Sequence, residues 1–150
     1  MPVRVQHEDF DVGAELARLR RDRADVGAVA SFIGIARDRN DGRDVGALVL
    51  EHYPGMTERS IEAIVAQACA RWGFLDALVI HRIGRLAPQD QIVLVAVAAR
   101  HRGEALAACA YIMDYLKTEA PFWKKESGSC GESWVEARDS DEKARARWGG

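Results

Sequence analysis

Two lysines lie on either side of a proline where a long apolar segment ends. Lys117 falls in the last turn of a helix predicted over residues 102–119, and Pro121 prevents that helix from continuing. A lysine at this place is explained by the helix dipole alone. A lysine on a buried helix also loses solvation, however, which lowers its pKa and makes it a usable base or nucleophile. Because Lys124 follows on the next segment beside aromatic residues, the pair indicates a candidate catalytic site.

Basic residues also follow two predicted strands. His101 and Arg102 stand where a strand over residues 91–99 gives way to the helix, and a helix N-terminus favours anions. Arg37 holds a similar place at the end of an earlier strand, where ligands of sheet proteins often bind. Gly34 would allow the backbone there to approach a ligand closely. Each of these residues is also explained as polar loop surface, so a phosphate or carboxylate site depends on their converging in the fold.

The cysteines and histidines do not predict a metal site. The three cysteines form no Cys-x-x-Cys pair, and Cys69 and Cys109 fall on apolar helical faces, where a buried inert thiol is expected. Cys130 lies in a Gly-Ser-Cys-Gly stretch that is exposed enough for a persulfide carrier, but Glu126 and Glu132 flank it and disfavour a reactive thiolate. The four histidines lack the spacing of a helical metal site, and we expect no metal and no cofactor.

Length and composition favour one soluble domain over residues 1–150. Hydrophobic residues make up 48% of the chain and charged residues 29%, which is ordinary for a globular protein. The net charge of −2 gives no general reason to expect nucleic acid or an acidic membrane as a partner. No segment approaches the roughly 18 to 20 apolar residues of a membrane helix, and the N-terminus has no apolar signal region, so a cytoplasmic location is expected.

Helical periodicity predicts three main helices. Asp11 can cap the first, whose apolar face carries Val12, Leu16 and Leu19 and which ends in the charged run of residues 20–25. The second begins near Thr57 and stops at Gly73. Its apolar positions are Ile61, Ile64, Val65, Ala68, Cys69 and Trp72. The third, over residues 102–119, has apolar residues on most sides and should be largely buried. One of its faces consists of Leu106, Cys109, Ala110, Met113 and Leu116.

The strands surround these helices in the sequence. They are expected over residues 26–36, 46–53, 75–83 and 91–99, and the last is continuously apolar, as in a central strand covered on both faces. Residues 37–44 should form a solvated, mobile loop. A short hairpin around residues 127–131 and a last charged helix over residues 140–148 complete the chain. The order β-α-β-β-α-β-β-α-β-β-α indicates an α+β fold.

Six strings, in order along the chain, resemble the family of molybdopterin synthase catalytic (large) subunits. They run from about residue 30 to residue 141, so the resemblance covers most of the sequence. The strings are FIGIAR (32–37), LEHYPGM (50–56), IHRIGRL (80–86), AARHRGEA (98–105), DYLKTEAPFWKKE (114–126) and WVEARDSD (134–141). The resemblance implies an α/β-hammerhead fold of the α+β class with an additional small antiparallel β region.

The resemblance also implies an activity and its partners. The family member would be a sulfurtransferase of molybdenum cofactor biosynthesis that works as a homodimer within a heterotetramer. Its partner would be a small ubiquitin-like subunit whose C-terminal Gly-Gly tail carries a thiocarboxylate. Two sulfur transfers from this sulfur carrier to cyclic pyranopterin monophosphate would produce the dithiolene of molybdopterin.

The matched strings assign roles to single residues. The resemblance makes Lys117 the first catalytic candidate and Lys124 the second. It gives Arg37, His101 and Arg102 to the phosphate and the pterin; the rest of the pocket would be the backbone at Ile35 and Ala36, with Lys125 and Glu126. In the resulting hypothesis Lys117, with a lowered pKa, assists proton transfer as the thiocarboxylate sulfur attacks, and Lys124 stabilises negative charge on the opening phosphate.

The competing interpretation is a non-enzymatic module that binds a phosphate ligand or RNA. It predicts salt-sensitive nucleic-acid binding and no dependence on a thiocarboxylated protein. The acidic C-terminal region and the lack of a long basic stripe count against it. The chain also ends in Trp148-Gly149-Gly150, which is either a flexible end or a tail that occupies the pocket of a neighbouring subunit.

Overall fold

A central mixed sheet holds the apolar strand that the sequence singles out. The computed structural model describes residues 2–37, 39–40, 43–120, 122–128, 131–135 and 145–149, without the side chains of residues 39–40, 43–47, 123–128 and 131–135. The main sheet has the order β1-β5-β7-β2, with β1 parallel to β5 and the other pairs antiparallel. Its strands are β1 (Val3–Gln6), β5 (Asp76–Arg82), β7 (Gln91–Ala99) and β2 (Ala28–Ile35). Because β7 lies inside the sheet with helices on both faces, its residues 93–99 are buried, as predicted.

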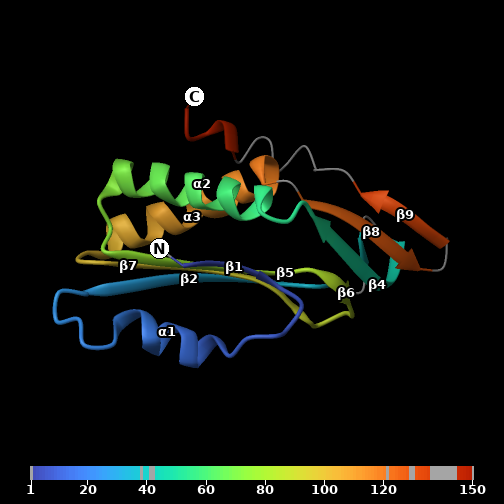
Figure 1. Cartoon of the computed structure of the whole chain (residues 1–150), viewed down its shortest axis with the longest axis horizontal. Coiled ribbons are helices and arrows are strands. Elements are labelled where there is room, and N and C mark those ends of the chain that lie inside the picture. Colours follow the sequence, from blue (N-terminus) through green and yellow to red (C-terminus); the bar gives the residue numbers. More distant parts are fainter. Residues whose placement is uncertain are drawn as a thin grey trace.

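Two helices cover one face of this sheet and one covers the other (Figure 1). On the first face α2 (Met56–Trp72) and α3 (Arg102–Glu119) enclose the larger core, in which the predicted stripe of α2 buries Ile61, Ile64, Val65 and Ala68. Gly73 ends α2 with a left-handed φ of 63°, and its N–H donates to the carbonyl of Cys69 at 2.7 Å. On the other face α1 (Val12–Arg20) is capped by Asp11, whose carboxylate accepts from the Ala14 N–H at 3.0 Å.

A second sheet, which has five strands, extends from one end of the main one (Figure 1). It consists of β3 (Arg39–Asn40), β4 (Arg43–His52), β8 (Phe122–Gly128) and β9 (Gly131–Val135), and β6 (Gly84–Leu86) pairs with β4 as well. All of its pairs are antiparallel. This sheet confirms the α+β class with an additional antiparallel β region. The expected hairpin around residues 127–131 is the β8–β9 connection.

Three sequence-based expectations change, and a fourth falls largely outside the described residues. Residues 37–44 are not simply a loop, because β3 and the start of β4 pair there. The segment after β5 forms β6, whose partner β4 lies more than thirty residues away in sequence. Leu106 is 61% exposed, since α3 packs with only part of its apolar circumference. The expected last helix lies mainly outside the described residues, of which 145 and 146 are helical. In the part of the chain that the structure describes, no helix has the length and apolar character to cross a membrane.

Candidate active site

The end of β2 is fixed by the turn that precedes β7. The Ala36 N–H donates to the carbonyl of Asp90 at 2.9 Å, and the Gln89 N–H donates to the carbonyl of Ala36 at 2.7 Å. Ala36 is therefore buried, while Ile35 and Arg37 on either side of it are exposed. Ile35 and Arg37 can contact a ligand with their side chains, but both backbone groups of Ala36 already have partners within the chain.

The absence of a side chain at Gly34 allows β2 and β7 to pack closely, and this contact explains the glycine without a ligand. A Cβ at this position would lie 2.7 Å from Cγ1 of Val93 on the neighbouring strand β7. Real carbon atoms do not approach so closely, so the β2–β7 pair requires a residue without a side chain here. The expectation that Gly34 admits a ligand is replaced by this close contact between strands.

Lys117 lies where the sequence predicts, in the last turn of α3. Its neighbour Leu116 is buried in the larger core, whereas Lys117 itself is exposed. The desolvation expected for this lysine is therefore not supplied by its own chain. A second chain or a substrate must cover the lysine if it is to work outside water.

Lys124, Lys125 and Glu126 occupy consecutive positions in β8, an inner strand of the second sheet. Their backbones pair with Leu50, Val49 and Leu48 of β4 on one side and with Val135, Trp134 and Ser133 of β9 on the other. Their side chains lie outside the described part of the structure. The strand begins at Phe122, whose ring stacks on His81 with ring centroids 3.9 Å apart. This contact attaches the start of β8 to the end of β5.

His81 and Phe122 were not recognised as a structural pair from the sequence. The sequence groups His81 with the basic residues 81–85, but the imidazole is buried, and its Nδ1 lies 2.8 Å from the carbonyl oxygen of Arg82. The available signal was its position directly after the apolar run Ala77-Leu78-Val79-Ile80 of the same strand. The stacking of Phe122 on His81 holds the first residue of β8 against β5. It thereby helps to fix the positions of Lys124 and Lys125, which follow in the same strand.

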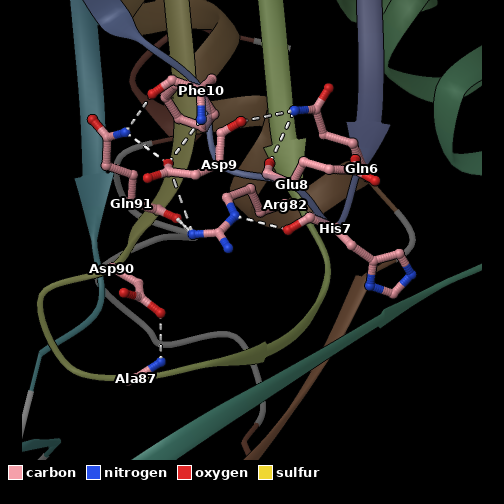
Figure 2. A network of polar contacts seen from close by, with 9 residues as sticks. All are labelled: Gln6, His7, Glu8, Asp9, Phe10, Arg82, Ala87, Asp90 and Gln91. Atoms are coloured by element: carbon pink, nitrogen blue, oxygen red, sulfur yellow. Dashed lines mark hydrogen bonds and ion pairs between the residues drawn. The ribbon is translucent and has the colours of Figure 1, made fainter.

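The guanidinium of Arg82 forms hydrogen bonds within the chain, so its donors are used for structure and not for binding an anion. Figure 2 shows its guanidinium between the β1–α1 connection and the start of β7, where Nε donates to the carbonyl of His7 at 3.1 Å and Nη1 to that of Gln91 at 3.0 Å. The Gln91 amide donates to the Asp9 carboxylate at 2.8 Å. This bond, followed by the Phe10 N–H, lowers the pKa of Asp9, and the more distant charge of Arg82 adds to the effect. The network holds together the end of the sheet that carries Ile35 and Arg37.

His101 and Arg102 lie at the opposite end of the main sheet. In the antiparallel pair of β2 and β7, Ile35 is opposite Gln91, whereas His101 and Arg102 follow Ala99 at the far end of β7. Eight steps of about 3.3 Å along β7 separate the two ends by roughly 26 Å. One copy of the chain thus groups Ile35, Arg37, Lys117 and the start of β8, and keeps the other two basic residues apart from them.

His101 and Arg102 form a helix N-terminus that is open to solvent. His101 has the extended backbone of a cap (φ −131°, ψ 151°) and Arg102 is the first helical residue of α3. Both side chains are exposed. The helix starts where the sequence predicts, and a helix N-terminus presents N–H groups and the positive dipole end, so an anion site at this position remains a prediction.

The thiols do not contribute to this site as described. Cys109 is a buried residue of α3 that faces β7, and burial raises its pKa to about 11, so it is the inert thiol that the sequence predicts. Cys69 is half-buried near the end of α2. Cys130 lies outside the described residues. Among the residues that are described, no group of three or more histidine, cysteine or acidic side chains is arranged to hold a metal ion.

Comparison with known proteins identifies the family. The sequence model of the MoaE protein family matches residues 5–119. The molybdopterin synthase catalytic subunit of Ralstonia nicotianae is 64% identical over 147 residues, which cover 98% of this chain and 84% of the relative. The molybdopterin biosynthesis MoaE protein of Burkholderia ambifaria superposes with a TM-score of 0.86 at 54% identity, covering 99% of this chain and 98% of that one.

A more distant structure shares the fold alone. It is a chain from the protein–protein complex of subunits 1 and 2 of the molybdopterin-converting factor of Helicobacter pylori, 19% identical with a TM-score of 0.71. The alignment covers 91% of each chain. The family match over most of the sequence and the close relatives lead to one conclusion: the chain belongs to the MoaE family, the family of molybdopterin synthase catalytic subunits.

Proposed function

We propose that this chain is the catalytic subunit of a molybdopterin synthase and works as a sulfurtransferase in molybdenum cofactor biosynthesis. The observation that carries the proposal is the 64% identity, over 98% of the chain, with a molybdopterin synthase catalytic subunit. The substrate is cyclic pyranopterin monophosphate, which receives two sulfur atoms to form the dithiolene of molybdopterin. We place the reaction in the cytoplasm.

The sulfur donor in this proposal is a second protein. A catalytic subunit implies a further subunit, and the Helicobacter pylori structure that shares the fold contains two different subunits. We infer that the partner is a small ubiquitin-like carrier whose C-terminal thiocarboxylate enters the site. The exposed Lys117 suits this arrangement, because an incoming tail would cover the lysine and remove it from water.

The described residues support a division of work at the site. Lys117 assists proton transfer as the thiocarboxylate sulfur attacks the pterin side chain, and Lys124 on the neighbouring strand stabilises negative charge on the opening phosphate. Arg37, His101 and Arg102 bind the phosphate and the pterin, since planar guanidinium groups form paired bonds with phosphate oxygens. The exposed Ile35 lines the pocket next to the buried Ala36, and Lys125 and Glu126 complete it from β8.

A site that uses all of these residues takes them from two copies of the chain. One copy separates Arg37 and Lys117 from His101 and Arg102 by more than 20 Å, on the strand geometry given above. The edge strand β2 and the adjacent helix α3 expose the apolar side chains Phe32 and Leu106, which suits contact with a second copy. We therefore propose a homodimer in which each site combines the Lys117 end of one copy with the Arg102 end of the other, flanked by one small subunit per site.

Reconstitution tests the function directly. The purified chain is mixed with its thiocarboxylated small partner and cyclic pyranopterin monophosphate, and dithiolene formation is followed by the fluorescence of the oxidised pterin. Product that requires all three components supports the proposal. Absence of product with a partner that is active with another catalytic subunit would reject it. Salt-sensitive RNA binding in its place would favour the non-enzymatic module.

A further inference from the structure

The last described residues, 145–149, pack against the outer side of the two helices that cover the main sheet, and we call them the C-terminal clasp (Figure 1). The half-buried ring of Trp148 meets the ring of Trp72 edge-on at a centroid distance of 5.5 Å and that of Tyr111 at 5.7 Å. Trp72 belongs to α2 and Tyr111 to α3. The clasp therefore joins both helices through one aromatic cluster.

Two hydrogen bonds to a single carboxylate fix the clasp on α3. The Trp148 indole N–H donates to Oδ2 of Asp114 at 2.6 Å, and Nη2 of Arg147 donates to the same oxygen at 2.9 Å. The Asp114 side chain is only 16% exposed, so its charge-assisted bond from the half-buried Trp148 is partly shielded from water, whereas Arg147 is 57% exposed. From α2, Nη1 of Arg71 donates to the Trp148 carbonyl at 3.0 Å.

A second set of contacts reaches the final residue of α3. Arg145 forms an ion pair with Glu119, and its guanidinium lies 5.8 Å from the ring centroid of Tyr115. Clasp contacts on α3 thus fall at Tyr111, Asp114, Tyr115 and Glu119. These positions lie on both sides of Lys117, from less than two turns before it to about half a turn after it.

The end of α3 lacks the cap that ends α2. Gly73 gives α2 a left-handed cap that binds a late carbonyl, whereas α3 ends at Ala120 in an extended conformation (φ −76°, ψ 135°). The following residue in sequence is Pro121, which has no N–H to offer. The Thr118 hydroxyl donates only at 3.4 Å, to the Asp114 carbonyl. Contacts from outside the helix therefore have more influence on its last turn than a cap does.

We propose that the C-terminal clasp is a positioning device for Lys117, in which Asp114 and Trp148 are the positioning residues. The inference rests on the proposed function, because it assigns the clasp a part in that reaction. Lys117 is exposed on a helix end without a cap, so its ammonium group keeps a fixed place only if the helix end does. Reacting groups must be held within a fraction of an ångström, and small displacements lower the rate strongly.

The test compares two truncations of the full chain, each assembled with the small subunit. Ending the chain after Ala144 removes the whole clasp, whereas ending it after Trp148 removes only the glycines and keeps the contacts to Asp114 and Glu119. Hydrogen exchange is measured for the amides of residues 114–119, with those of residues 105–110 as an internal reference. The kcat and the KM for the pterin precursor are measured at a temperature at which every variant is folded.

The expected result separates the two truncations. The chain ending at Ala144 should exchange residues 114–119 at least tenfold faster and lose about tenfold in kcat with KM within twofold, and the chain ending at Trp148 should behave like the full chain. Trp148→Phe, which keeps the ring and loses the N–H donor, should fall between the full chain and Trp148→Ala.

Two outcomes would overturn the inference. Unchanged exchange at residues 114–119 after removal of the clasp would show that it does not hold the helix end. Faster exchange with unchanged kcat would reduce the clasp to a stabilising contact. If the short truncation does not fold, Asp114→Asn and Trp148→Phe in the full chain provide the same two measurements. A full chain that yields no product would reject the proposed function, while the exchange result would still decide whether the clasp holds α3.

Discussion

At the scale of single residues, exposure distinguishes Lys117 from an ordinary catalytic lysine. Groups with perturbed pKa values usually owe them to burial or to a neighbouring charge. Lys117 belongs to a helix whose other side is packed in the core, but its own side chain is exposed to solvent. Its chemistry therefore depends on what covers it, and the proposed site supplies that cover only when the sulfur-carrying tail is in place.

Lys117→Ala should lower turnover by at least 100-fold, the usual loss on removing a general acid or base. Because the side chain is exposed, the melting temperature should stay within a degree or two of the original value. Lys117→Arg is the matched variant, since it keeps the charge but cannot release a proton near neutral pH. Full activity of Lys117→Arg would exclude proton transfer and leave an electrostatic role.

Gly34→Ala tests the close contact between β2 and β7. The added methyl would lie 2.7 Å from Cγ1 of Val93, so we expect a loss of about 1–3 kcal/mol in the free energy of unfolding, measured with urea. Gly103→Ala is the control, because a Cβ there meets nothing within 4 Å and a helical alanine is favoured over glycine. If both variants unfold at the same urea concentration, the contact with Val93 does not explain the glycine.

At the scale of elements, a local sequence pattern predicted a helix or strand correctly where the pattern extended over many residues. The stripe of α2 with its stop at Gly73, and the nine apolar residues of β7, each predict an element from its own residues. β3 and β6 have two and three residues, and both exist because they pair with β4. No local pattern records that pairing. The exposure of Leu106 escaped prediction for the same reason, since periodicity does not tell how much of an apolar helix its neighbours cover.

Removing the N-cap of α1 should weaken the helix that covers the second face of the sheet. Asp11→Ala leaves the Ala14 N–H without its carboxylate partner and should cost about 1 kcal/mol of unfolding free energy. Asp11→Asn keeps an oxygen at the same place and should be nearly neutral. Thermal or urea unfolding of the pair isolates the cap, and equal losses in both variants would instead indicate that the charge of Asp11 matters.

At the scale of the whole molecule, the sequence proposes residues for one site but does not indicate how the fold distributes them. The matched strings name Arg37, Lys117 and Arg102 as members of one pocket, and their spacing along the chain is compatible with a single copy. The antiparallel register of β2 and β7 shows that one copy places them at two ends. Register depends on contacts between strands far apart in sequence, so no motif could have contained it.

Mixed dimers test the two-copy site. Lys117→Ala and Arg102→Ala chains, each inactive alone, are unfolded together, refolded and assembled with the small subunit. Half of the dimers should carry one defect in each copy, and each of these should contain one intact site, so about a quarter of the original activity should return. Chains mixed without exchange of subunits are the control. No recovery, with mixed dimers demonstrated by mass spectrometry, would place both residues in a site within one copy.

The strand order also has a consequence for the synthesis of the protein. β1 finds its only partner in the main sheet in β5, and β2 finds its own in β7. Residues 3–6 therefore have no partner in this sheet until residue 82 has been synthesised, and residues 28–35 have none until residue 99 has. Both strands of the N-terminal part of the chain thus emerge before the strands that they join in the main sheet. Slower elongation through β5 and β7 should lengthen the time for which β1 and β2 have no partner in this sheet.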